Sequence, residues 1–191
     1  MIANNFTALI DACVLYKAPV RDLLMRLAVK DLYRAKWTNE IHDEWIRNLL
    51  KNRPDIEKKR LERTRDLMNS HIRDCLVDGY QELIESLELP DKGDRHVLAA
   101  AICARADVIV TCNELDFPSQ NIKKYGIEVQ NPDVFISHLI DLDPLVVCDV
   151  VRTLRESLKN PPRSINDLLA GYKGQGLTRT VQALEKYSEL L

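Results

Sequence analysis

The side chains in this sequence that are best able to do chemistry are acidic, and they stand where predicted elements begin or end. Asp11 follows an apolar, β-branched run at residues 6–10 that is typical of a buried strand. Asp94 precedes an alanine-rich helical pattern, and Asn113 and Asp116 follow the next short apolar run. A buried core has no use for carboxylates at these positions, so they indicate a binding site.

A predicted parallel sheet would bring these residues together. Ligands of such sheets bind outside the carboxyl ends of the strands, so Asp11 should share an edge with Asn113 and Asp116. Asp94, at the head of its helix, and Glu44, beside the apolar stripe of a helix at residues 39–52, are expected to converge there too. Four carboxylates in one cleft repel each other strongly unless a cation is bound.

The donor set favours a hard cation. The five cysteines and four histidines form no CxxC pair and no Cys/His cluster, which argues against a zinc site or a disulfide framework. Oxygen ligands without His or Cys select Mg²⁺ or Mn²⁺. Such ions activate water and stabilise the oxygens of a phosphoryl group, so the chemistry implied is phosphodiester hydrolysis.

Each of these residues also has an ordinary structural explanation. Asp11 could end a strand at a turn, and Asp116 could form an Asx-turn. Asp91 followed three residues later by Asp94 resembles a helix-capping arrangement. Glu44 alone could be a surface glutamate. The functional interpretation therefore depends on the combination.

The elements that must position these residues alternate between helix and strand. A strand at 6–10, a helix beginning near Pro19, helices at 39–52 and from Pro54, a helix at 94–106, a strand at 108–111 and a helix-to-strand unit at 121–129 predict an α/β domain with a mainly parallel sheet. The residues after Asn131 are predicted to be helical throughout. We expect one domain at residues 1–142 and a helical C-terminal extension at 143–191.

Composition restricts the function class only loosely. The 191 residues carry a net charge of -2, which gives no general preference for nucleic acid. The N-terminus lacks the pattern of a signal peptide, and no apolar run is long enough to span a bilayer. We therefore expect a soluble, cytoplasmic protein with reduced thiols and no membrane partner.

A basic segment at residues 47–65 begins three residues after Glu44 and could lead a phosphate backbone toward the cleft. It carries eight basic side chains against Asp55, Glu57 and Glu62; the basic residues are Arg47, Lys51, Arg53, Lys58, Lys59, Arg60, Arg63 and Arg65. The alternative is a solvated helix with ion pairs such as Asp55 with Lys59. Arg95 could reach a phosphate or pair with a carboxylate.

Four segments in this order, LIDACVLY, WTNEIHDEW, DKGDRHVLAAAI and VIVTCNELDFP, resemble the PIN-domain nucleases over about residues 5–140. Bacterial PIN proteins of this size are similar to the VapC-type toxins of toxin–antitoxin modules. The resemblance implies a three-layer α/β/α domain and an endoribonuclease that depends on Mg²⁺ or Mn²⁺. It also implies an RNA substrate, a cognate antitoxin protein and a homodimer.

The resemblance carries over to individual residues. Asp11 matches the family's first strand-end Asp, Glu44 its helix Glu six residues after Thr38, and Asp94 its third acidic position. Many members have Asp soon after the last motif's Thr, where this chain has Asn113, with Asp116 three residues on. We expect Asp116 to supply the fourth carboxylate and Asn113 a neutral ligand or a water contact.

Several alternatives stay open at this stage. Thr111 either holds a water or orients an acidic neighbour, as the family resemblance implies, or reflects β-propensity alone. His42 and His96 are interpreted as structural or surface residues. The chain could also be a PIN-like RNA- or protein-binding module without catalysis. An aspartyl-nucleophile phosphatase is disfavoured because Cys13 stands where the partner carboxylate of Asp11 would be.

Overall fold

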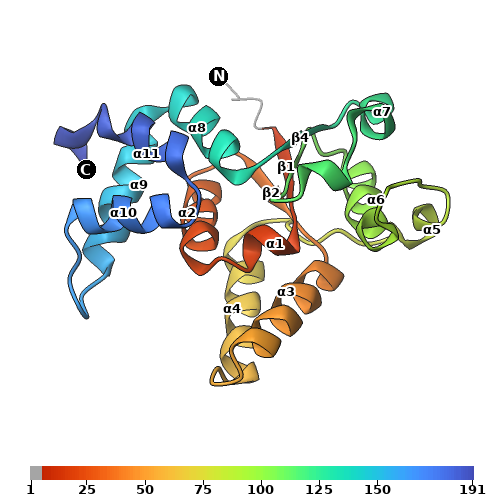
Figure 1. Ribbon diagram of the computed structural model, residues 1–191, viewed down its shortest axis with the longest axis horizontal. Coiled ribbons are helices and arrows are strands. Elements are labelled where there is room, and N and C mark those ends of the chain that lie inside the picture. Colours follow the sequence, from red (N-terminus) through yellow and green to blue (C-terminus); the bar gives the residue numbers. More distant parts are fainter. Residues whose placement is uncertain (1–5) are drawn as a thin grey trace. The chain divides into compact units, whose positions relative to one another are not determined.

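The computed structural model describes residues 6–191, which form two compact units (Figure 1). The first unit comprises the chain up to Tyr16 and Tyr33–Asn131, and the second comprises Lys17–Leu32 and Pro132–Leu191. The first unit contains the whole sheet, and the second is helical. The candidate acidic residues all lie in the first unit.

A parallel sheet with the strand order β2-β1-β3-β4 forms the centre of the first unit. Its strands are β1 (Thr7–Ile10), β2 (Arg34–Lys36), β3 (Val108–Val110) and β4 (Glu128–Gln130). β1 pairs with β3 so that Ile10 lies opposite Val110. The carboxyl ends of the two central strands therefore meet at the same edge, next to Asp11 and Thr111.

Helices of the first unit pack against this sheet and against each other. They are α1 (Ala12–Leu15), α3 (Asn39–Asn52), α4 (Lys58–His71), α5 (Gln81–Ile84), α6 (Arg95–Cys103) and α7 (Ser119–Ile122), with 3₁₀ turns η1 (Lys92–Asp94), η2 (Glu114–Asp116) and η3 (Lys123–Tyr125). The alanine-rich run of α6 is buried, because its small side chains let the helix approach β1 and β3 closely. This close packing fixes the start of α6, and therefore Asp94, relative to the strands.

A buried polar network holds α3, the helix that carries Glu44. Thr38 caps the helix by accepting a 3.0 Å hydrogen bond from the backbone N–H of Ile41. Within α3, Trp45 Nε1 donates to His42 Nδ1 at 3.0 Å. The Oδ1 of Asn69 on α4 lies 3.0 Å from His42 Nε2, which connects the two helices. Because Nδ1 accepts, the proton of the neutral ring must lie on Nε2 and point to Asn69.

The second unit is a helical assembly of α2 (Ala18–Val29), α8 (Pro132–Leu142), α9 (Pro144–Ser157), α10 (Ile165–Gly174) and α11 (Thr178–Glu185), followed by the 3₁₀ turn η4 (Ser188–Leu190). Asp133 of α8 caps α11, since its carboxylate accepts 2.8 Å hydrogen bonds from the backbone N–H groups of Arg179 and Thr180. α10 starts with a capping box formed by Ser164 and Asp167. None of the helices in residues 6–191 combines the length and apolar character needed to cross a bilayer.

The predicted α/β class with a parallel sheet and C-terminal helices is confirmed. Two local predictions were wrong or incomplete. The helix expected from Pro54 begins at Lys58, because residues 54–57 form a turn, and the three-residue strand β2 was not predicted. The predicted boundary between residues 142 and 143 stays a prediction.

Candidate active site

Asp11 lies at the end of β1 with a carboxylate held in one orientation. Its backbone N–H donates to Val110 O at 3.0 Å, which continues the pairing of β1 with β3. Its Oδ1 accepts from the N–H of Ala12 at 2.6 Å, and its Oδ2 accepts from Thr111 Oγ1 at 2.7 Å. Asp11 is only 4% exposed, so this carboxylate has little freedom to turn.

Thr111 connects the ends of β1 and β3. The residue is fully buried, and its hydroxyl donates to Asp11 while it accepts a 3.0 Å hydrogen bond from the N–H of Asn113. The side chains of Asn113 and Asp116 make no hydrogen bond within residues 6–191. Their oxygens therefore remain available to a ligand.

Asp94 lies at the junction of η1 and α6. The capping explanation applies to Asp91, whose Oδ1 accepts a 2.7 Å hydrogen bond from the N–H of Gly93. The Asp94 carboxylate makes no capping hydrogen bond. Capping therefore explains only one of the two carboxylates.

The charges of the other candidate acidic residues act on the carboxyl group of Asp94. Burial raises the pKa of Asp94 from 3.8 to about 7, helped by the negative charges of Asp11, Asp116, Asp91 and Glu44. Like charges raise the pKa of a carboxyl only when they lie close to it. Asp11, Glu44, Asp94 and Asp116 thus share one electrostatic environment at the carboxyl edge of the sheet.

Glu44 and His96 form a contact that the sequence did not reveal. His96 Nε2 on α6 lies 3.5 Å from Glu44 Oε2, and its Nδ1 lies 3.7 Å from Glu40 Oε2. Burial lowers the pKa of His96. The hydrogen bond to Glu44 and the negative charges of Glu44, Glu40 and Asp11 outweigh this effect, so the pKa is raised overall. A histidine two residues after Asp94 gives no sequence signal for such a role.

Cys13 is a second unexpected neighbour of Asp11. Its Sγ donates to Asp11 Oδ2 at 3.1 Å and lies 3.4 Å from Thr111 Oγ1. A hydrogen bond with Cys112, burial and the charge of Asp11 raise the pKa of the Cys13 thiol. The thiol therefore stays protonated and acts as a hydrogen-bond donor to Asp11, not as a thiolate ligand.

The basic residues predicted to contact RNA lie mainly on α3, α4 and the turn between them. Arg47, Lys51, Arg53, Lys58, Lys59 and Arg60 are all exposed. The observed ion pairs are Arg53 with Asp55 at 2.8 Å and Lys58 with Glu62 at 3.4 Å, in place of the expected Asp55–Lys59 pair. Arg95 is half-buried, and its Nε has no hydrogen-bond partner within residues 6–191.

The acidic group fits a hydrated divalent cation bound through few protein ligands. All of its charged donors are hard oxygens, and the pKa of Asp94 is raised by burial and by negative charges that a cation would offset. Within residues 6–191, no three side chains of His, Cys, Asp or Glu are arranged to hold an ion directly. An ion such as Mg²⁺ does not need three direct protein ligands, because it keeps several of its waters in protein sites.

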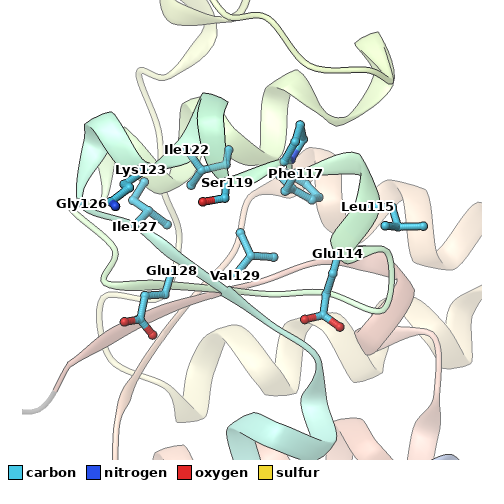
Figure 2. A pocket seen from close by; sticks show the side chains of 11 residues that line it. Glu114, Leu115, Phe117, Ser119, Ile122, Lys123, Gly126, Ile127, Glu128 and Val129 are labelled. Atoms are coloured by element: carbon cyan, nitrogen blue, oxygen red, sulfur yellow. The ribbon is translucent and has the colours of Figure 1, made fainter.

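A separate hollow of about 870 Å³ lies beside β4 (Figure 2). Phe117, Ile122 and Val129 form much of its apolar lining, and the four acidic residues of the cluster do not line it. The carboxylates of Glu114 and Glu128 at the hollow accept hydrogen bonds from Asn131 and Gln130. This hollow is therefore distinct from the acidic cluster.

Two family models match segments of this chain. The family model described as "PIN domain" matches residues 7–115, and the model described as "VapC50 C-terminal domain" matches residues 132–186. The curated "Putative ribonuclease VapC50" of Mycobacterium tuberculosis (strain ATCC 25618 / H37Rv) is 38% identical over 91 residues, which is 48% of this chain and 53% of the relative. The match thus spans about half of each protein. No solved structure matches the chain significantly.

Proposed function

This chain belongs to the PIN-domain family, and from that premise we propose that it is a metal-dependent endoribonuclease that hydrolyses RNA phosphodiester bonds. The observation that carries the proposal is the set of acidic residues at the carboxyl edge of the sheet, where burial and the like charges around Asp94 together raise its pKa to about 7. Strongly perturbed pKa values in proteins cluster at functional sites. The proposed catalytic and metal-binding residues are Asp11, Glu44, Asp94 and Asp116.

The proposed roles follow from how each carboxylate is held. Asp11 would bind the cation with its orientation set by Thr111 and Cys13. Asp94 and Asp116 would complete the anionic site, and Asn113 would contribute a neutral oxygen or contact a bound water. When bound, Mg²⁺ or Mn²⁺ supplies Lewis-acid stabilisation of the phosphoryl oxygens and lowers the pKa of a water that attacks phosphorus.

The exposed basic side chains of α3 and α4 would bind the RNA backbone. Arg47 and Lys51 follow Glu44 on α3 by three and seven residues, a spacing that places all three on one face of the helix. Arg53, Lys58, Lys59 and Arg60 would add phosphate contacts beyond the end of α3. Arg95, beside Asp94, would contact a phosphate near the cation.

The relative's name supports a narrower proposal, a toxin of a toxin–antitoxin pair. In that role the protein would act in the cytoplasm as a homodimer and would be held inactive by a cognate antitoxin. Co-purification of the protein with the product of an adjacent small reading frame, together with loss of RNase activity in that complex, would support this role. Full activity in the complex would contradict it.

Cleavage of RNA by the purified protein tests the proposed function. We expect cleavage with Mg²⁺ or Mn²⁺, none after EDTA treatment, and recovery when the ion is restored. The Asp11→Asn variant should lose the activity, whereas Asp43→Asn, which changes an exposed acid on α3, should keep it. Cleavage that survives both EDTA and Asp11→Asn would contradict the proposal. It would favour a binding module without catalysis, with the cleavage due to another nuclease in the preparation.

A further inference from the structure

We propose that His96 is a positioning residue that holds the Glu44 carboxylate in place for metal binding. This inference rests on the proposed nuclease function. The sequence alone favoured a structural or surface role for His96. The inference follows from the contacts of its buried imidazole with two glutamates.

The His96 ring is enclosed between two carboxylates of one helix face. Its side chain is 8% exposed, with Nε2 3.5 Å from Glu44 Oε2 and Nδ1 3.7 Å from Glu40 Oε2. Glu40 and Glu44 lie one turn apart on α3, whereas His96 lies on α6. The ring therefore connects α3 to α6.

The two glutamates differ in what else holds them. Glu40 Oε2 accepts a 3.0 Å hydrogen bond from Tyr80 Oη, so that carboxylate has a second partner. Glu44 makes no other hydrogen bond or ion pair within residues 6–191. His96 Nδ1, which faces Glu40, has no hydrogen-bond partner in that part of the chain. The functional contact of the ring is therefore the one from Nε2 to Glu44.

Glu44 needs such a partner because its side chain is 32% exposed and has several rotatable bonds. Without the ring, the carboxylate would sample several rotamers and lose entropy each time it bound an ion. His96 also lies two residues after Asp94, so its contact with Glu44 links the start of α6, next to one proposed ligand, to α3, which carries another. Partners that orient a ligand in this way typically change metal affinity by roughly 10- to 100-fold.

Two conservative substitutions separate positioning from packing. The amide nitrogen of Gln lies near the position of histidine Nε2, and that of Asn lies near the position of Nδ1. His96→Gln therefore keeps a donor for Glu44, whereas His96→Asn keeps one only for Glu40. Both amides remove the ring, so a packing role predicts similar losses from the two variants.

Titration calorimetry of the full chain with Mn²⁺ measures the effect, and thermal unfolding of the metal-free variants measures the loss of packing. We expect His96→Asn to weaken Mn²⁺ binding by roughly 10- to 100-fold and His96→Gln to keep most of the affinity. Glu40→Gln, the matched control, should leave the Mn²⁺ affinity unchanged. In a Glu44→Gln background, His96→Asn should cause no further loss, because the residue it positions is already altered.

Equal loss of Mn²⁺ affinity in the Asn and Gln variants, or no loss in either, would overturn the role of His96. A further loss in the Glu44→Gln background would overturn it too. These outcomes leave the proposed function intact, because the wild-type protein still binds Mn²⁺ and cleaves RNA. A wild-type protein that neither binds Mn²⁺ nor cleaves RNA would contradict the proposed function itself.

Discussion

At the scale of single residues, the site combines one rigid carboxylate with others that are free to bind. Asp11 is fixed by hydrogen bonds from Ala12, Cys13 and Thr111, whereas the side chains of Asp94 and Asp116 make no hydrogen bond within residues 6–191. The first carboxylate is thus preorganised, and the others are kept close despite their mutual repulsion. A preorganised carboxylate next to uncompensated negative charge is typical of a cation-binding site.

The repulsion at Asp94 predicts a stability effect. Asp94→Asn should stabilise the metal-free protein at pH 8 by on the order of 1 kcal/mol, a figure discounted because the side chain is only half-buried. The folded-state pKa of Asp94 is raised from 3.8 to about 7, so the metal-free wild type should lose stability as pH rises through that window. Urea denaturation in EDTA at pH 4 and pH 8 measures the difference in the free energy of unfolding between Asp94→Asn and wild type. This difference should vanish at pH 4.

Asp116 and Asn113 make separable predictions about the fourth ligand. The charge of Asp116 acts on Asp94, whereas Asn113 is neutral and its backbone N–H is already committed to Thr111. Asp116→Asn should therefore weaken Mn²⁺ binding by roughly tenfold or more, and Asn113→Ala should weaken it less. If calorimetry shows the reverse order, Asn113 holds the ion directly.

At the scale of elements, the site depends on how α3 and α6 are fixed. α6 is positioned by its buried alanine face, and α3 is positioned by the network of Trp37, His42, Trp45 and Asn69. The Oδ1 of Asn69 is within hydrogen-bond distance of both Trp37 Nε1 and His42 Nε2, at 2.8 and 3.0 Å. This single oxygen links α4 to α3 and to the segment before it.

Asn69→Ala should therefore destabilise the protein by about 2–3 kcal/mol, because it removes the acceptor that two buried donors share. The control Asn52→Ala removes an exposed amide whose 3.1 Å hydrogen bond to Tyr16 lies in solvent, and should change stability by less than about 0.5 kcal/mol. Chemical denaturation measures both. Equal effects of the two substitutions would show that the network adds nothing.

The exposed basic face of α4 predicts salt-dependent RNA binding. Replacing Lys58, Lys59 and Arg60 with Gln should weaken binding and lower the dependence of log affinity on log salt by up to about two, given about 0.7 per phosphate contact with single strands. Binding is best measured with a catalytically inactive Asp11→Asn protein. An unchanged salt slope would assign these side chains to the solvated surface.

At the scale of the whole molecule, sequence patterns predicted the architecture better than the details of the site. Alternating apolar runs indicated the α/β class, and the structure places Asp11 and Thr111 where the two central strands end, as the sequence predicted. β2 was missed because three residues, Arg34–Lys36, carry too short a pattern and only one of them is fully buried. The roles of Cys13 and His96 could not be predicted, because they depend on contacts between elements far apart in the sequence.

Two different family models match the chain, one over residues 7–115, which includes α2 of the second unit, and one over residues 132–186. In the C-terminal helices, the apolar stripe of Leu145, Val146, Val150, Val151 and Leu154 is buried only in part. Val150, Val151 and Leu154 are buried, whereas Leu145 is 65% exposed. Apolar periodicity alone could not tell which members of the stripe would be covered.

The central claim is that the acidic cluster of the first unit performs metal-dependent RNA cleavage. Single-turnover cleavage of RNA over a range of Mg²⁺ concentrations tests it most directly, with wild type, Asp94→Asn and the control Asp43→Asn compared in parallel. We expect Asp94→Asn to be folded, at least as stable as wild type and inactive at every Mg²⁺ concentration, and Asp43→Asn to match wild type. Wild-type rates in the Asp94→Asn protein would contradict the claim.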